Sequence, residues 1–240
     1  MISLSIIVPV YNEEKTIGKI LRQLDSLELP INKEIIIVDD GSSDGTVNQI
    51  EKYLSSIKKS SIKLISHSKN QGKGKAVRTG ISKAKGAYIV IQDADLEYDP
   101  NYLKILIQPI LSGERKVVYG TRLKRMPNLN EDERTPRFLL HYLGNRILSF
   151  IISALFIAWI TDMETGYKIF PRREFYKLKI KSTGFDFEPE ITTKLLKRGH
   201  KILEIPIKTI PRGYSEGKKL NTFSDGSKAL WAIIKYRFVN

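Results

Sequence analysis

Short apolar segments alternate with helical patterns along the first half of this chain. The segments are rich in β-branched residues and end at turn-forming or acidic residues, as expected of strands buried on both faces of a sheet. They cover residues 4–10, 34–38, 63–66, 87–91 and 116–120. Apolar residues at helical spacing predict helices from residue 16 to 27 and over 47–57, 75–84 and 101–111. This alternation predicts an α/β fold with a mainly parallel central sheet flanked by helices.

Carboxylates follow two of the predicted strands. Asp39 and Asp40 end one strand, and Asp93, Asp95 and Glu97 follow another. Ligands of open α/β sheets bind beyond the carboxyl ends of the strands, so these acids lie where a substrate would bind. If the strand continues in extended form, Asp93 and Asp95 point the same way and suit Mg²⁺ or Mn²⁺. A lone Asp-x-Asp is more often a pair of solvated acids, but a second acidic set at the same sheet edge favours a cation site.

The composition fits one domain with an anionic partner. A chain of 240 residues with 41% hydrophobic residues can bury one sizeable core, so we expect a single domain over residues 1–240. The formal net charge of +14 favours nucleic acid, nucleotide phosphates or an anionic membrane face, without choosing among them. Cysteine is absent, which excludes disulfides and thiolate metal sites. The first residues lack a basic region, so we expect no signal peptide.

The second half contains two apolar helical segments. Residues 147–160 carry no charge but are too few to span a bilayer, so the helix expected over 138–160 is either buried or interfacial. Basic residues before it and Trp159 near its end favour the interfacial position. A last helix over 225–238 offers a second membrane-facing patch, and the polar stretch 123–136 is expected to be a mobile loop. We therefore expect membrane-associating helices here, without a transmembrane span.

Further patterns complete the chain. A helix is expected to begin within residues 185–190, and a strand covers 202–207. Residues 72–74, Gly-Lys-Gly, lack the spacing of a P-loop and equally fit the turn that begins a helix. Residues 211–219 form a basic loop, punctuated by glycine, of the kind that closes on phosphate.

Four motifs occur in order in the first half of the chain. They are Ile-Ile-Val-Pro-Val-Tyr-Asn-Glu-Glu at 6–14, Ile-Val-Asp-Asp-Gly-Ser-Ser-Asp-Gly-Thr at 37–46, Asn-Gln-Gly-Lys-Gly-Lys-Ala at 70–76 and Gln-Asp-Ala-Asp-Leu-Glu at 92–97. Together they resemble the family 2 glycosyltransferases with the Rossmann-like GT-A fold. The resemblance implies that residues 1–122 bind the nucleotide sugar. The implied donor contacts are Pro9, Tyr11, Glu13, Val38, Asp40, Asp93, Ala94 and Asp95.

The resemblance also implies a divalent metal, Mg²⁺ or Mn²⁺, bound by Asp95 and Glu97. Mannose synthases often have Gln where this chain has Glu97, a departure that leaves the metal contact in place and the donor undecided. Tyr11 could instead only pack on the sheet.

The second half is similar to the branch that contains dolichyl-phosphate mannose synthase. The matching segments are Tyr-Gly-Thr-Arg at 119–122, Phe-Asp-Phe-Glu-Pro-Glu at 185–190 and the basic loop at 211–219. That branch moves one hexose from a nucleotide sugar to a polyprenyl phosphate. The similarity implies an acceptor-binding half over 123–240. In it Arg122, Arg137 and His141 hold the acceptor phosphate, and Arg212 and Lys218 close over the donor phosphates. His141 is otherwise an ordinary core or surface histidine.

We therefore predict a metal-dependent, inverting transfer of one hexose from a GDP-mannose or UDP-glucose type donor to dolichyl or undecaprenyl phosphate. Asp93, Asp95 and Arg122 are the expected catalytic residues. A lipid phosphate needs no general base, because its second pKa is about 6 and its oxygen is already anionic. Three further acids either orient sugar hydroxyls or arginines, or act as helix caps and surface ion pairs: Asp162, Glu164 and Asp186.

The expected partners are a nucleotide sugar, a polyprenyl phosphate and a membrane surface, without nucleic acid. The chain would be a peripheral protein on the cytoplasmic side of the membrane. The Gln-x-x-Arg-Trp motif of polysaccharide synthases is absent from the sequence, so we do not expect a processive synthase.

Three alternatives stay open. A nucleotidyltransferase would have a glycine-rich basic loop after the first strand, where this chain has Pro9 to Glu13. A basic nucleic-acid-binding module fits the charge, but no reading helix or aromatic and basic sheet motif is recognisable. A family 2 transferase acting on a non-lipid hydroxyl fits the same donor motifs.

Overall fold

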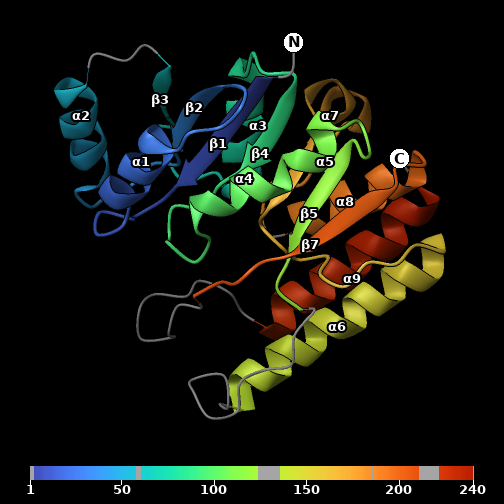
Figure 1. Ribbon diagram of the computed structural model, residues 1–240. Helices are drawn as coiled ribbons and strands as arrows, with labels where there is room; N and C mark the ends of the chain where they lie inside the picture. The colour runs from blue at the N-terminus through green and yellow to red at the C-terminus, as the bar shows by residue number, and fades with distance from the viewer. Residues whose placement is uncertain (1–2, 58–60, 124–135, 185, 211–221, 240) are drawn as a thin grey trace.

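A central sheet of seven strands runs through the described residues, in the order β3-β2-β1-β4-β6-β5-β7 (Figure 1). The computed structural model of the chain describes residues 3–57, 61–123, 136–184, 186–210 and 222–239. The strands are β1 (Ser3–Val10), β2 (Asn32–Asp39), β3 (Ile62–Ser66), β4 (Tyr88–Ile91), β5 (Val117–Thr121), β6 (Lys168–Pro171) and β7 (Ile202–Pro206). Neighbouring strands are parallel except on the two sides of β6. The predicted mainly parallel sheet is confirmed.

β6 is a strand that the sequence did not predict. It lies antiparallel between β4 and β5, and its Ile169 faces Val90 on one side and Val118 on the other. Only four residues form it, and one of them is the charged Lys168, so its apolar pattern is too short to be recognised. Because β6 is inserted in the middle of the sheet, the preceding residues 161–166 are carried to the edge where β4 and β5 end.

Helices cover both faces of the sheet (Figure 1). They are α1 (Ile17–Ser26), α2 (Thr46–Ser56), α3 (Lys73–Lys83), α4 (Leu103–Leu106), α5 (Gln108–Leu111), α6 (Pro136–Phe156), α7 (Arg172–Leu178), α8 (Phe187–Lys197) and α9 (Thr222–Phe238). Successive strand residues point to opposite faces, so Ile6 packs in a core with α1, α2, α4 and α5, and Ile7 packs in a second core with α3, α7 and α8.

The helix expected over 101–111 is divided into short pieces. A 3-10 helix, Pro100–Tyr102, precedes α4, and α5 begins only at Gln108. Pro109 has no amide hydrogen to donate to the preceding turn, so the hydrogen-bond ladder is interrupted there. The continuous helix of the sequence prediction is therefore wrong, although α4 and α5 still bury the same apolar side.

α6 and α9 pack on each other and enclose a third, smaller core that includes Ile152 and Ile233. α6 ends at Phe156 and not at 160, because Ile157 adopts a left-handed conformation (φ 50°). No helix of the described residues is long and apolar enough to cross a membrane. The membrane-associating helices of the prediction are not confirmed, since part of each apolar surface is used for this internal packing. Most of the predicted loop 123–136 lies outside the described residues.

Candidate active site

The acidic turn, residues 93–97, follows β4 directly. β4 ends at Ile91, and Leu96 adopts a left-handed conformation (φ 66°), so the strand does not continue. The sequence predicts that Asp93 and Asp95 point the same way only if the strand continues through them, and this condition is not met. Oδ1 of Asp95 instead accepts a hydrogen bond from the backbone amide of Glu97 at 3.0 Å, which closes the turn.

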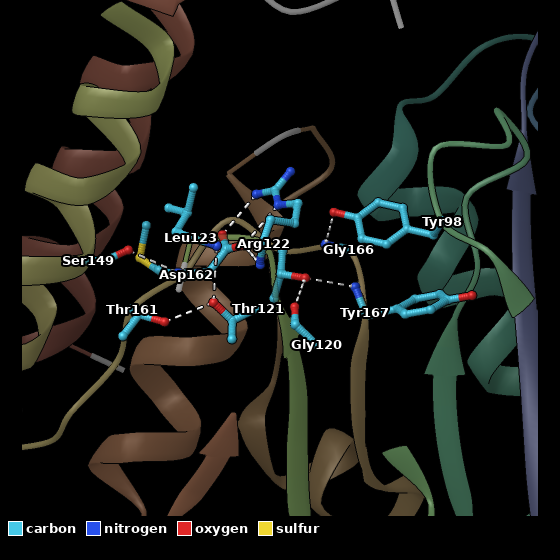
Figure 2. A network of polar contacts seen from close by, with 12 residues as sticks. Tyr98, Gly120, Thr121, Arg122, Leu123, Ser149, Thr161, Asp162, Gly166 and Tyr167 are labelled. Atoms are coloured by element: carbon cyan, nitrogen blue, oxygen red, sulfur yellow. Dashed lines mark hydrogen bonds and ion pairs between the residues drawn. The ribbon is translucent and has the colours of Figure 1, made fainter. Parts of the chain in front are cut away.

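Buried polar side chains fix this turn. The Gln92 side chain is fully buried and donates to the carbonyls of Asp93 at 3.0 Å and Tyr98 at 3.2 Å. The hydroxyl of Tyr167 donates to the other end of the same amide. The hydroxyl of Tyr98 accepts the backbone amide of Gly166 at 2.9 Å, as Figure 2 shows. The turn is thus tied to the loop before β6.

Asp95 and Glu97 fit the metal that the sequence predicts. Both side chains are partly exposed on one turn at the carboxyl edge of the sheet. A protein often gives Mg²⁺ or Mn²⁺ only one or two carboxylates when substrate phosphates supply other ligands. No group of three or more candidate ligands is found among the described residues.

Lys73 joins the acidic turn to α8. Its Nζ lies 2.8 Å from Oδ1 of Asp93 and 3.3 Å from Oε1 of Glu188. Burial alone would lower the pKa of Lys73, but the two carboxylates outweigh burial and raise it. Gly72 places the lysine: it has a φ of 94°, and an added Cβ would collide with the carbonyl of Thr183. The Gly-Lys-Gly motif is thus the turn that begins α3, and it also supplies a fixed cation.

Arg122 forms a buried ion pair with Asp162 (Figure 2). The Asp162 carboxylate accepts the Arg122 backbone amide at 2.9 Å, Nε at 2.8 Å and Nη2 at 2.8 Å. Burial would raise the pKa of Asp162, but the guanidinium outweighs burial and lowers it. The Arg122 guanidinium also lies 5.9 Å from the centre of the Tyr98 ring, within range of a cation–π contact. Of the two roles predicted for Asp162, the structure therefore supports orientation of an arginine.

Further charged side chains inside the protein surround the loop 161–166, which carries Asp162. Glu204 on β7 accepts the backbone amides of Thr161 at 2.9 Å and Asp162 at 3.0 Å. Burial raises the pKa of Glu164 to about 7. Lys168 is fully buried and donates to the carbonyls of Met163 and Thr165. The loop 161–166 is therefore positioned from β6 and β7 by charged groups inside the protein.

The first two motifs form one edge of the site. The backbone amide of Glu13 donates to Oγ1 of Thr46 at 2.8 Å, so the loops after β1 and β2 are joined. Asp40 is 2% exposed, and its carboxylate accepts the backbone amides of Gln71 and Gly72 and the ring of His67. In this structure Asp40 therefore positions the loop before α3. Pro9 and Val38, with Tyr11, lie at the ends of β1 and β2 beside it.

Several predicted residues cannot be placed in the site. Arg212 and Lys218 lie outside the described residues, as do the side chains of Arg137 and His141 on the first turns of α6. Asp186 occupies the N-cap position of α8 but makes no side-chain capping hydrogen bond, and its Oδ1 instead accepts the backbone amide of Gly184, before the helix, at 3.2 Å.

Three site residues were missed by reasoning from the sequence: Lys73, Lys168 and Glu188. Each lies far along the chain from the acidic turn, and a local pattern gives no signal for such a contact. Two weak signals could have marked them: Lys73 is a charged residue between two glycines, and Glu188 lies in the matching segment 185–190, in the first turn of a helix.

Comparison with known proteins shows the family of the chain. Residues 5–179 match the family described as glycosyl transferase family 2. The chain is 31% identical to a dolichyl-phosphate beta-glucosyltransferase of Dictyostelium discoideum, over 99% of this chain and 74% of that protein. It is 32% identical to a UDP-N-acetylglucosamine–dolichyl-phosphate N-acetylglucosaminyltransferase of Methanococcus voltae, over 90% of this chain and 89% of that protein.

A solved structure shares the fold. Glucosyl-3-phosphoglycerate synthase from Mycobacterium tuberculosis, solved with Mn²⁺, uridine diphosphate and phosphoglyceric acid, superposes with a TM-score of 0.73 at 18% identity. The match covers 99% of this chain and 79% of that one. The chain has a GT-A fold and belongs to glycosyl transferase family 2.

Proposed function

We propose that this chain transfers one hexose, with inversion, from a nucleotide sugar to a polyprenyl phosphate. The observation that carries the proposal is the position of Arg122, a cation fixed by Asp162 and in contact with Tyr98 at the end of the acidic turn. An anionic acceptor held by Arg122 would lie next to a donor whose diphosphate occupies that turn. The relatives named for dolichyl phosphate support the same acceptor class.

The reaction needs few chemical groups from the protein. An anionic oxygen of the lipid phosphate attacks the anomeric carbon while the bond from that carbon to the diphosphate breaks, and the nucleoside diphosphate leaves. The protein has to hold two anions close together, which Arg122 does for the acceptor by fixed hydrogen-bond donors. A divalent cation on Asp95 and Glu97 would supply charge neutralisation for the leaving diphosphate. The Mn²⁺ of the mycobacterial structure supports this metal class.

The donor is proposed to be a UDP-sugar of the glucose or N-acetylglucosamine type. The Methanococcus voltae relative is named for UDP-N-acetylglucosamine, and the Dictyostelium discoideum relative is named as a glucosyltransferase. One name gives a UDP-sugar donor and the other gives a glucosyl group, so both favour a UDP-sugar of this type over GDP-mannose.

The acceptor places the reaction at a membrane surface. Exposed apolar side chains recur along one side of α6 and of α9, which lie side by side, and include Phe150, Trp231 and Phe238. After α6, Ile157 is 98% exposed and Trp159 is 83% exposed. Such side chains suit the headgroup region of a bilayer. Because the net charge of the chain is +14, we propose that it binds the anionic cytoplasmic leaflet of the membrane.

Transfer is tested with radiolabelled UDP-glucose, UDP-N-acetylglucosamine and GDP-mannose, each with polyprenyl phosphate and Mg²⁺ or Mn²⁺. We expect label from a UDP-sugar in the organic phase, a large loss in Arg122→Met, and little change in Arg115→Met. Arg115 is a matched control because it precedes the strand that Arg122 follows, at the opposite sheet edge. Label that enters only a soluble hydroxyl acceptor would reject the lipid acceptor.

Membrane binding is tested by flotation with vesicles of phosphatidylcholine, with and without phosphatidylserine. A Trp159→Ser/Trp231→Ser variant should float less than the unaltered chain. Tyr176→Ser removes another exposed aromatic side chain, on α7, and should leave flotation unchanged. Equal flotation of all three proteins would reject this membrane surface.

A further inference from the structure

Glu188 in the first turn of α8 has a buried carboxylate without a hydrogen bond. The residue is 5% exposed, and neither carboxylate oxygen has a hydrogen-bond partner among the described residues. Lys73 at 3.3 Å and Lys168 at 3.7 Å supply positive charge, but not a hydrogen bond of normal geometry. Buried polar atoms nearly always have hydrogen-bond partners, so the site lacks donors that a ligand could bring.

Glu190, two residues later on the same helix, shows how this protein satisfies a structural glutamate. Its carboxylate is fully buried and accepts hydrogen bonds from the amides of Lys181 and Ser182, from the Ser182 hydroxyl and from Lys194. A purely structural role for Glu188, balancing buried lysines, would be expected to show comparable hydrogen bonds. Its carboxylate has none of them.

The carboxylate of Glu188 also lies beside the acidic turn. One ammonium, that of Lys73, contacts both Glu188 and Asp93. The Lys73 side chain is 23% exposed and that of Asp93 is 18% exposed, so the pair that adjoins Glu188 is open to solvent, while the Glu188 oxygens themselves are buried behind it. The proposed function places the donor diphosphate at the same turn, and the hexose is bonded directly to that diphosphate.

We propose that Glu188 binds the hexose of the donor and helps to select it. Its two oxygens accept hydrogen bonds from hydroxyl groups of the sugar, and Asp93, which contacts the same ammonium of Lys73, accepts a further one. Hydroxyl groups are the missing donors, and a site built to hydrogen-bond them rejects sugars that lack them. This inference rests on the proposed function, because it requires a nucleotide sugar at the acidic turn.

Calorimetric titration separates the sugar contact from the nucleotide contact. The unaltered chain, Glu188→Gln and the control Glu190→Gln are each titrated with UDP and with UDP-glucose, UDP-N-acetylglucosamine and GDP-mannose in the presence of Mn²⁺. In Glu188→Gln we expect affinity for the sugar nucleotide to fall about tenfold or more, as for loss of a charged hydrogen-bond acceptor, while UDP affinity changes less than about twofold. In Glu190→Gln the ratio of the two affinities should stay unchanged.

Deoxy donors give a second readout that does not depend on how well the variant folds. With the unaltered chain, a UDP-sugar that lacks the contacted hydroxyl should bind about tenfold more weakly than its parent. The same deoxy donor should bind Glu188→Gln as well as its parent does, which locates the hydroxyl. If Glu188→Gln weakens UDP and the UDP-sugar equally, or if no deoxy donor is discriminated, Glu188 is only structural. If no nucleotide sugar binds the unaltered chain, the proposed function fails as well.

Discussion

Replacing Asp162 by asparagine tests whether charge holds Arg122 in place. Asp162 is fully buried, and its carboxylate accepts three hydrogen bonds from Arg122 at 2.8 to 2.9 Å. Asparagine has the same shape and keeps one acceptor oxygen, but it removes the negative charge. Breaking a buried ion pair costs about 3–5 kcal/mol. Because one acceptor remains and the Arg122 side chain is 21% exposed, we expect a loss of about 2–3 kcal/mol in the free energy of unfolding.

The loss is measured by urea unfolding, followed by tryptophan fluorescence. In a chain of this size it corresponds to a fall in Tm of roughly 4–12 °C, at about 2–4 °C for each kcal/mol. Glu114→Gln removes the same charge from an exposed position and should change stability by no more than about 0.5 kcal/mol. Asp162→Asn should also raise the KM for polyprenyl phosphate more than the Kd of the donor, since Arg122 loses its fixed orientation.

A double variant separates charge from shape. Arg122→Met/Asp162→Asn leaves no buried charge unpaired, so it should regain at least half of the stability lost in Asp162→Asn. Two results would refute the reasoning. One is a loss of less than about 1 kcal/mol in Asp162→Asn, and the other is simple additivity of the two substitutions in the double variant.

Three further predictions concern other residues. Burial raises the pKa of Glu164 from 4.5 to about 7, so the free energy of unfolding falls as the pH rises from about 5 to 7. Glu164→Gln removes this titration. Between pH 5 and pH 8 the stability of this variant, measured by urea unfolding, should therefore rise by about 2–3 kcal/mol relative to that of the unaltered chain. The pKa of Glu174 is shifted in the opposite direction. A hydrogen bond from Lys177 is the largest cause and other partners add to it, and together they lower this pKa to about 2. The free energy of unfolding therefore falls as the pH drops from about 5 to 2. Glu174→Gln should flatten that acid limb by about 1–2 kcal/mol, a value reduced for the exposure of Lys177. An added Cβ at Gly166 would lie 2.7 Å from Oδ2 of Asp93, so Gly166→Ala should slow transfer about 10- to 100-fold with an unchanged circular dichroism spectrum.

Much of the sheet could be predicted because its strands follow simple rules. β1 and β2 contain unbroken, buried apolar runs at 6–10 and 35–38, and α1 buries the residues that recur at helical spacing. Two other elements escaped for physical reasons. β6 has only four residues and starts with a buried lysine, and α7 is a helix of seven residues with too few turns to show a period.

The acids of the site were visible from the sequence, and their partners were not. Asp93 and Asp95 stand at the end of a strand, where topology alone predicts a ligand. The contact of Lys73 with Asp93 and Glu188 joins three distant parts of the chain, and it depends on how α3 and α8 approach the sheet. Arg122 was predicted from the resemblance. Its orientation by Asp162 depends on β6 carrying residue 162 beside the end of β5.

The buried pairs separate two electrostatic effects at this site. Lys73 and Arg122 are already paired with carboxylates, so their positions are set before an anionic substrate arrives. Asp162 engages Nε and Nη2 of Arg122, and the third guanidinium nitrogen points away from Asp162 (Figure 2). Such buried pairs are screened little by salt, whereas the surface charge that sums to +14 is screened within about 10 Å at 0.1 M. Added salt should therefore weaken the capture of donor and acceptor, through KM, and leave kcat for the bound substrates nearly unchanged.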